Sequence, residues 1–117
     1  MPGVALVLDD DRDTTEMVQL ALSLAGYTAE VVNDFEHAMK CIEKNRHCAF
    51  FMDYNVPRMD PQQFVSAVRQ LRNDLPIFLV SGRHDIKERA REVDVQGYIQ
   101  KPFAIEEIVN AVQMHCE

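Results

Sequence analysis

Cysteine is scarce in this sequence, and its spacing excludes the common metal and redox motifs. Cys41, Cys48 and Cys116 are odd in number, and no two of them form a C-x-x-C pair. Unpaired thiols are typical of the reducing cytoplasm. We therefore expect three free cysteines in a cytoplasmic protein.

Long apolar runs, leader-like segments and linkers are also lacking. No run approaches the ~18 apolar residues of a membrane span. The segment after Met1 leads directly into a short apolar run, unlike a signal peptide. The sequence contains no linker, repeat or low-complexity tract. We expect a single domain, residues 1–117, with no membrane segment and no output domain.

Positive charge is in the minority. Twelve Lys and Arg residues stand against 19 Asp and Glu residues, which gives a formal net charge of −7. A net negative charge opposes binding to a polyanion. Nucleic acid is therefore not expected as a direct partner.

Five short apolar runs alternate with segments of helical periodicity. The runs span residues 4–8, 28–32, 48–53, 77–80 and 95–99. Apolar runs without polar alternation suit strands that are covered on both faces. The first helix is expected to begin at Asp13 or Thr14. Its core-facing stripe is expected to consist of Met17, Leu20, Ala21 and Leu24.

This alternation predicts an α/β fold with right-handed crossovers. We expect a flavodoxin-like, doubly wound (βα)5 domain with a five-stranded parallel sheet in the order 2-1-3-4-5 and helices on both faces. Ligands bind such folds at the switch point, here between the first and third strands. Asp9 and Asp10 follow the first strand. Asp53 ends the third strand, which Pro57 prevents from continuing.

Three carboxylates are therefore expected to meet at one edge of the sheet. At ~5 Å and an effective dielectric of ~20, each charged pair repels by about 3 kcal/mol, so protons or a cation must enter. Oxygen ligands, with a loop carbonyl near Asn55, fit Mg²⁺ or Mn²⁺ better than zinc. Ser81 and Lys101 follow the fourth and fifth strands. A metal, a hydroxyl and an ammonium around Asp53 form a clamp for phosphoryl transfer to that carboxylate.

With these residues in place, the chain resembles a two-component response-regulator receiver (CheY-like) domain over essentially its whole length. The matching elements are Asp9-Asp10, Met52-Asp53-Tyr54-Asn55-Val56-Pro57-Arg58-Met59-Asp60, Ser81, Tyr98 and Lys101-Pro102-Phe103. The resemblance implies that Asp53 accepts a phosphoryl group from a sensor histidine kinase or a histidine phosphotransfer domain. It also implies that Mg²⁺ binds to Asp10, Asp53 and the Asn55 backbone carbonyl, with Asp9 acting largely through water, and that Lys101 pairs with the phosphoryl group.

The resemblance further implies a conformational switch. Ser81 would move toward a phosphoryl oxygen, and Tyr98 would turn inward behind it. The face formed by the fourth helix, fifth strand and fifth helix would then contact an unknown downstream target or a second copy in a homodimer. Asn55 and Arg83, which flank the site, would tune the phosphoryl lifetime. Such a domain catalyses only its own phosphorylation and dephosphorylation and is not otherwise an enzyme.

The sequence departs from the family pattern at three positions. Pro61 stands where glycine usually follows the Met-Asp pair, and Asp94 replaces a usual glycine before the fifth strand. Ala104 lacks the capping side chain that is common after Lys-Pro-Phe. No phosphorylation residue is lost.

Two other classes of function fit parts of the sequence. A receiver-like interaction module that is never phosphorylated would share the fold. A small haloacid-dehalogenase-like phosphatase would use Asp9 as its nucleophile, with Ser81 and Lys101 beside it. The phosphatase interpretation leaves Asp53 and the Pro57 loop unexplained.

Overall fold

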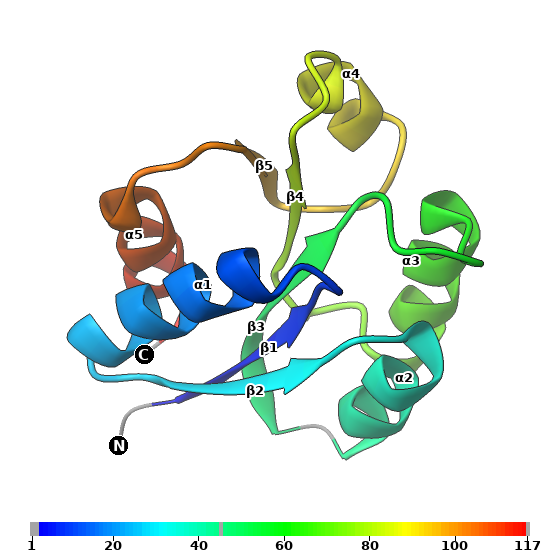
Figure 1. Cartoon of the computed structure of the whole chain (residues 1–117). Helices are drawn as coiled ribbons and strands as arrows, with labels where there is room; N and C mark the ends of the chain where they lie inside the picture. Colours follow the sequence, from blue (N-terminus) through cyan, green and yellow to red (C-terminus); the bar gives the residue numbers. More distant parts are fainter. Residues whose placement is uncertain (1–2, 45, 117) are drawn as a thin grey trace.

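The computed structural model describes residues 3–44 and 46–116 of the chain (Figure 1). Within these residues, five strands alternate with five helices. The elements are β1 (Val4–Leu8), α1 (Arg12–Leu24), β2 (Thr28–Val32), α2 (Phe35–Glu43), β3 (His47–Asp53), α3 (Pro61–Leu71), β4 (Ile77–Ser81), α4 (Ile86–Arg91), β5 (Gly97–Gln100) and α5 (Ile105–His115). The predicted α/β alternation is confirmed.

The strands form one parallel sheet in the order β2-β1-β3-β4-β5, which confirms the flavodoxin-like topology. β1 lies between β2 and β3, and Leu8 pairs with Met52 across the β1–β3 ladder. The residues that follow this pair, Asp9 and Asp53, are therefore level with each other at the carboxyl edge of the sheet.

Apolar side chains pack on both faces of the sheet. Successive strand residues point to opposite faces, so Leu6 and Phe50 pack with α2 and α3. Val7 and Phe51 pack on the other face with α1 and α5. All four side chains are almost fully buried. Figure 1 shows α1 and α5 together on one side of the sheet and α2 and α3 on the other.

Aspartate side chains accept hydrogen bonds from backbone N–H groups at the start of three helices. These caps are Asp11 for α1, Asp34 for α2 and Asp60 for α3. Pro61 occupies the first position of α3, where its missing N–H has no consequence. The prediction that α1 begins at Asp13 or Thr14 is wrong, because the Asp11 carboxylate accepts from the Asp13 N–H at 3.0 Å.

The face that α1 turns toward the core also differs from the predicted one. Met17, Leu20 and Leu24 are 39%, 48% and 67% exposed. The buried residues of α1 are Thr14, Thr15, Val18, Ala21 and Leu22. The two threonine hydroxyls can lie inward because they donate to the Asp11 carboxylate and the Arg12 carbonyl. Of the predicted stripe, only Ala21 is confirmed as buried, and it continues the buried face through Val18 and Leu22.

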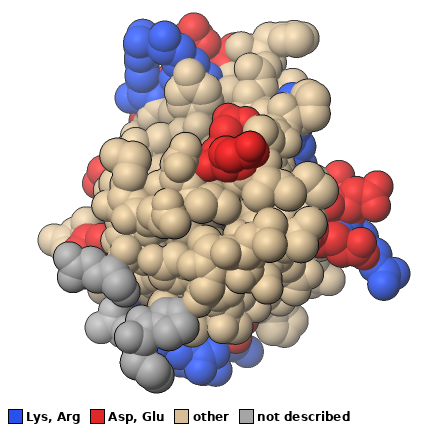
Figure 2. Space-filling view, turned by 90° about the vertical axis from the view of Figure 1, so that its left-hand side faces the viewer, with Lys and Arg blue, Asp and Glu red and all other residues tan. Residues whose placement is uncertain are grey.

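The residues of α1 that were wrongly predicted to face the core lie on an exposed surface. Leu20 and Leu24 on α1 and Met114 on α5 are all exposed. Figure 2 looks onto the side of the molecule where α5 lies, and it shows few charged side chains there. Among the described residues, no helix is long and apolar enough to cross a membrane.

The expectation of three free cysteines is wrong. Cys48 in β3 and Cys116, directly after α5, form a disulfide that joins residues 68 positions apart. Cys41 is free and buried. The pairing depends on α5 packing beside β3, which no spacing in the sequence reveals.

The last strand begins two residues later than predicted. β5 spans Gly97–Gln100 rather than residues 95–99. The Ile77 N–H donates to the Gln96 side-chain oxygen at 2.6 Å, while the Gln96 N–H donates to the Ile77 carbonyl at 2.9 Å. A side chain therefore occupies the place where the ladder would otherwise begin.

Candidate functional site

The carboxylates of Asp9, Asp10 and Asp53 meet at the carboxyl edge of the sheet. One oxygen from each lies within 4.8 Å of the others. Asp9 and Asp53 are buried, and Asp10 is exposed. The convergence follows from the topology, since β1 and β3 are neighbours that end side by side. Among the described residues, no second cluster of potential metal ligands is this compact.

Burial is the main cause that raises the pKa of the Asp53 carboxyl. The charges of Asp9 and Asp10 act in the same direction. The Asn55 N–H, which donates to Asp53 Oδ1 at 3.1 Å, and the Lys101 ammonium lower it. Three carboxylates and one ammonium leave the site with an excess of negative charge, and an all-oxygen donor set of this kind suits a hard divalent cation.

Lys101 reaches this cluster from the far end of the chain. Its Nζ lies 3.3 Å from Asp9 Oδ2, and its backbone N–H donates to the Ser81 carbonyl at 2.8 Å. The Lys101–Pro102 peptide bond is cis. The ammonium therefore lies beside the carboxylates, and Asp9 is its direct partner.

Ser81 ends β4, next to β3, and its side chain is fully buried. Its hydroxyl accepts hydrogen bonds from the Arg83 N–H at 3.1 Å and from Asn55 Nδ2 at 3.4 Å. Through Asn55, the hydroxyl is linked to the loop that begins at Asp53. The structure therefore places a hydroxyl, an amide and a carboxylate on adjacent strand ends.

The Arg83 side chain belongs to an ionic network that the sequence analysis missed. Both carboxylate oxygens of Asp85 accept from it, at 2.8 and 3.0 Å, and Arg89 donates to the same carboxylate at 3.1 Å. These bonds, chiefly those from Arg83, hold the pKa of Asp85 far below its usual value. The Arg83 guanidinium also lies 5.6 Å from the Tyr54 ring centroid. The i,i+4 spacing of Asp85 and Arg89 was the available sequence signal.

Asp85 does not cap α4 with its side chain, contrary to what its position before the helix indicates. Its carboxylate is occupied by the two arginines.

Tyr98 on β5 is 40% exposed, so its ring is turned at least partly to solvent. The roles that the sequence analysis gave to the Asn55 carbonyl, Tyr98 and Arg83 remain predictions.

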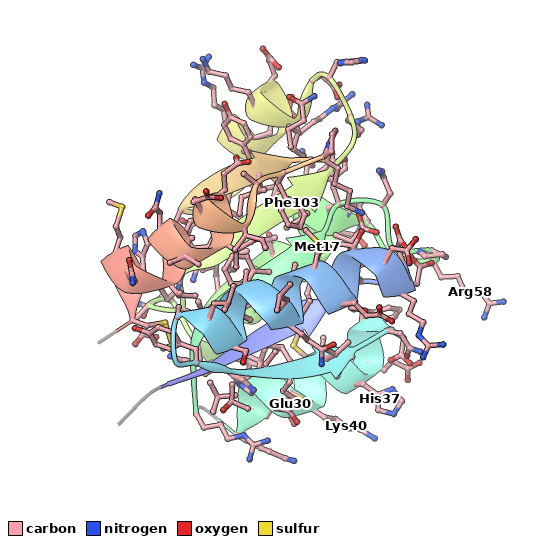
Figure 3. All side chains as sticks on the ribbon, turned by 60° about the vertical axis from the view of Figure 1, so that its left-hand side comes forward. Met17, Glu30, His37, Lys40, Arg58 and Phe103 are labelled. Atoms are coloured by element: carbon pink, nitrogen blue, oxygen red, sulfur yellow. A yellow bond between two sulfur atoms is a disulfide. The ribbon has the colours of Figure 1, made fainter. Side chains whose placement is uncertain are left out.

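A shallow cavity of about 350 Å³ adjoins the carboxylate cluster. Lys101 lines it, together with Met17 of α1 and Phe103. Figure 3 shows Met17 and Phe103 close together on this side of the molecule. The cavity beside Lys101 is therefore partly apolar.

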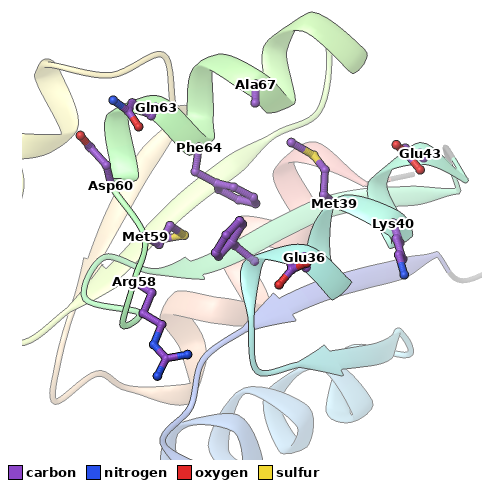
Figure 4. A pocket seen from close by; sticks show the side chains of 11 residues that line it. Glu36, Met39, Lys40, Glu43, Arg58, Met59, Asp60, Gln63, Phe64 and Ala67 are labelled. Carbon is purple, nitrogen blue, oxygen red and sulfur yellow. The ribbon is translucent and has the colours of Figure 1, made fainter.

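A larger cavity, of about 500 Å³, lies away from the carboxylates, between α2 and α3. Phe35 and Phe64 meet edge to face in its wall, with ring centroids 6.3 Å apart. Met39 and Met59 also line it, while Arg58 extends outward from its rim (Figure 4). It contains none of the acidic cluster, so we place the candidate chemistry at the three aspartates.

A buried histidine lies at the opposite edge of the sheet. His47 Nε2 is 2.7 Å from Glu30 Oε1, and Arg46 donates to the same oxygen at 2.9 Å. Burial lowers the pKa of His47, and the bonds from Arg46 and His47 lower that of Glu30 to about 2. The neutral imidazole therefore donates to a carboxylate. This pair lies remote from Asp53, at the beginning of the same strand.

Comparison with known proteins gives one consistent result. The family described as response regulator receiver domain matches residues 5–113. The response regulator MprA of Mycobacterium sp. (strain KMS) is 36% identical over 111 residues, which cover 93% of this chain and 48% of that protein. MprA of Mycobacterium leprae is 33% identical over 110 residues. The chain thus spans about half the length of these curated relatives.

Solved structures agree on the fold. A putative response regulator from Chloroflexus aurantiacus has a TM-score of 0.88 and 32% identity, over 97% of each chain. The chemotaxis response regulator CheY4 of Vibrio cholerae has a TM-score of 0.85 and 28% identity, over 97% of this chain and 98% of its own.

Proposed function

Because this chain belongs to the family of response regulator receiver domains, which act in two-component signalling, we propose that it carries a reversible phosphoryl group on Asp53. The donor would be a phosphohistidine of a sensor histidine kinase or of a histidine phosphotransfer domain. An Asp53 oxygen would bond to phosphorus while the phosphorus–nitrogen bond breaks and its electron pair stays on the histidine. The observation that carries the proposal is the meeting of three carboxylates with Lys101 at one sheet edge.

Asp10, Asp53 and the Asn55 carbonyl would hold Mg²⁺ or Mn²⁺, with Asp9 acting largely through water. The ion would neutralise phosphoryl oxygens as charge builds on them. Lys101 would pair with another phosphoryl oxygen. Its ion pair with Asp9 already holds the ammonium near the carboxylates. The low positive charge around Asp53 and the all-oxygen donor set support this assignment.

The switch would run from Ser81 to the α4-β5-α5 face. Ser81 would move its hydroxyl toward the phosphoryl group and exchange its bonds to Arg83 and Asn55 for one to phosphate. Tyr98, now 40% exposed, would turn inward. The face would then contact the unknown downstream target or a second copy of the chain. A Tyr98→Trp variant gives a fluorescence reporter, because an indole that leaves water shifts its emission to shorter wavelength.

The remaining parts of the proposal concern the protein's setting. We place it in the cytoplasm, where its kinase partner has access to ATP, and we expect no direct contact with nucleic acid. Its catalysis would be limited to its own phosphorylation and dephosphorylation. Asn55 and Arg83 would tune how long the phosphoryl group persists.

The direct experiment uses acetyl phosphate as the donor. We expect the wild type with Mg²⁺ to gain one phosphoryl group that is stable in acid and labile in base, as seen by intact mass. Asp53→Asn should gain none, whereas Asp74→Asn, which changes a 76% exposed carboxylate in the same way, should behave as wild type. An unchanged wild-type mass would favour the interaction module. Turnover of a phosphate ester that survives Asp53→Asn but not Asp9→Asn would favour the phosphatase.

A further inference from the structure

Cys48 and Cys116 join two elements with different tasks in the proposed function. Cys48 is the second residue of β3, the strand that ends at Asp53. Cys116 directly follows α5, which belongs to the proposed output face. Their Cα atoms are 5.3 Å apart, within the range that disulfides require. The bond therefore ties the end of α5 to the strand that carries the phosphoacceptor.

The surroundings of the bond are built to accommodate it. Cys116 is 4% exposed and packs in the apolar layer on the α1–α5 face, with Cys48 at the edge of the same layer. Gly3 lies against the Cys48 sulfur so closely that a Cβ there would be only 2.7 Å from it. The Tyr27 hydroxyl donates to the Cys116 carbonyl at 3.4 Å. The strand, the helix end and the segment before β1 thus converge on this bond.

The third cysteine is kept apart from this pair. Cys41 lies in α2 and packs in the apolar layer on the opposite face of the sheet. Burial and the Glu30 carboxylate raise the pKa of its thiol. A buried thiol with little thiolate is a poor partner in disulfide exchange. Cys41 therefore cannot readily replace either bonded cysteine.

We propose that Cys48 and Cys116 form a reversible redox site that restrains the end of α5. The proposal rests on the proposed function through its setting, since disulfides are rare in the reducing cytoplasm and those that occur there are usually redox-sensing or catalytic. Reduction by a thiol such as glutathione delivers two electrons and two protons and leaves two Cys thiols, while two glutathione molecules join in a disulfide. Oxidised glutathione drives the reverse exchange.

The bond affects a limited part of the molecule. Ile108, Ala111 and Val112 bury most of the inner face of α5 without help from the disulfide. Reduction should therefore leave the helix in place and release its last turn, around His115. Cys48 precedes Asp53 by five residues, or about 16 Å of strand, so the phosphorylation chemistry should not change directly.

Thiol counting after alkylation in denaturant tests the site. Protein equilibrated with oxidised glutathione should show one free thiol, from Cys41, and protein equilibrated with millimolar reduced glutathione should show three. Three thiols under both conditions would overturn the pairing. One thiol under both conditions would overturn reversibility, because the bond would then be a permanent one.

Two physical measurements test the restraint on α5. Reduction of the wild type should lower Tm by roughly 15–20 °C, as expected for opening a loop of this length, and should speed hydrogen exchange in the last turn of α5 by about tenfold or more. Cys41→Ser should respond as wild type does, whereas Cys48→Ser and Cys116→Ser should not respond. If these two variants fail to fold, reduction of the wild type alone still decides the outcome. Equal exchange in both redox states would overturn the restraint.

The redox site and the proposed function can fail separately. Acetyl phosphate with Mg²⁺ should label the oxidised and the reduced protein at the same rate. Absence of labelling in both states would contradict the proposed function, and the thiol counts would still decide the redox site. Labelling in both states together with unchanged thiol counts would overturn the redox site alone.

Discussion

The ammonium of Lys101 lies 3.3 Å from the carboxylate of Asp9, although 92 residues separate them in the chain. Among the residues that the structure describes, Lys101 is the one cation in direct contact with the acidic cluster, and it contacts the most buried of the three carboxylates. Within the described part of the chain, no basic side chain forms an ion pair with Asp10 or Asp53. These two carboxylates are the ones proposed to bind the metal directly.

Removing the Lys101 charge should separate metal binding from phosphorylation. We expect Lys101→Met to bind Mg²⁺ at least as tightly as wild type, because a competing cation is gone, and to be phosphorylated by acetyl phosphate about tenfold or more slowly. Titration of Mg²⁺ by calorimetry and the rate of mass increase measure the two effects. Lys87→Met, on the exposed side of α4, is the matched control. Equal loss of both properties would mean that Lys101 only supports the local structure.

The Asp53 carboxyl should destabilise the metal-free protein at neutral pH. Its pKa in the folded state is raised, chiefly by burial. Its contribution to folding is therefore most favourable below its unfolded value of 3.8 and is lost as the pH rises through the folded-state pKa. Asp53→Asn should raise the free energy of unfolding at pH 7 by on the order of 1 kcal/mol. Urea titrations in EDTA measure the difference.

Added Mg²⁺ gives the counterpart of that experiment. It should stabilise the wild type, because a ligand that binds only the folded state raises the free energy of unfolding. Asp53→Asn should gain less from the same addition. If Asp53→Asn is less stable than wild type in EDTA, or gains as much stability from Mg²⁺, repulsion and burial of the Asp53 charge are not what destabilise the metal-free protein.

His47 should make the protein less stable in mild acid. Burial lowers its pKa below the 6.5 of the unfolded state. As the pH falls below about 6.5, the unfolded chain takes up the proton first, so the free energy of unfolding falls. Glu30, with a pKa of about 2, adds its own loss only below its unfolded-state pKa of 4.5. Asp53, whose pKa is raised, also titrates in this range, so urea titrations between these two pH values are made on the Asp53→Asn background, where they report on the histidine.

His47→Gln should remove most of that pH dependence, because the amide can still donate to Glu30 but takes up no proton. His37→Gln is the matched control, since the His37 side chain is 66% exposed. If His37→Gln flattens the profile as much as His47→Gln does, the buried imidazole is not its source.

Asp85 should shorten the lifetime of phosphorylated Asp53 by holding Arg83. Asp85→Asn would release the guanidinium, which would then be free to pair with the phosphoryl group. We expect the aspartyl phosphate to last about three- to tenfold longer in this variant. The rate at which mass is lost after removal of acetyl phosphate measures the lifetime. Glu92→Gln is the control, since Glu92 pairs with Arg89, at 3.6 Å, and not with Arg83.

A double variant tests whether Arg83 mediates this effect. Arg83→Ala combined with Asp85→Asn should have the same lifetime as Arg83→Ala alone. A further lengthening in the double variant would show that Asp85 acts by another route, for example through Arg89.

Local patterns in the sequence were enough for the fold and for the location of the site. Apolar runs bounded by turn residues predict strands, and helical periodicity between them predicts crossovers, so the sheet order followed from connection rules. Asp9, Asp10 and Asp53 were found because acidic residues directly follow apolar runs. Each of these signals lies within a few consecutive residues.

Two other features depend on which of several nearby partners a side chain selects. The apolar residues of α1 offer two stripes, and the one through Val18, Ala21 and Leu22 is the buried one. Thr14 and Thr15 extend this face because their hydroxyls donate to Asp11 and Arg12. Asp85 is bound to Arg83 and Arg89 and not to the start of α4. The i,i+4 spacing indicates the pair of Asp85 and Arg89, but it does not decide between that pair and a helix cap.

The sequence by itself determined a doubly wound α/β domain with carboxylates at the ends of β1 and β3. Only the tertiary structure decided that Lys101 contacts Asp9, that Cys48 joins Cys116, and that His47 is buried against Glu30. The physical reason is range: backbone periodicity and strand ends are set by neighbouring residues, whereas an ion pair or a disulfide needs atoms within a few ångströms, and packing of the whole sheet and its helices fixes those distances.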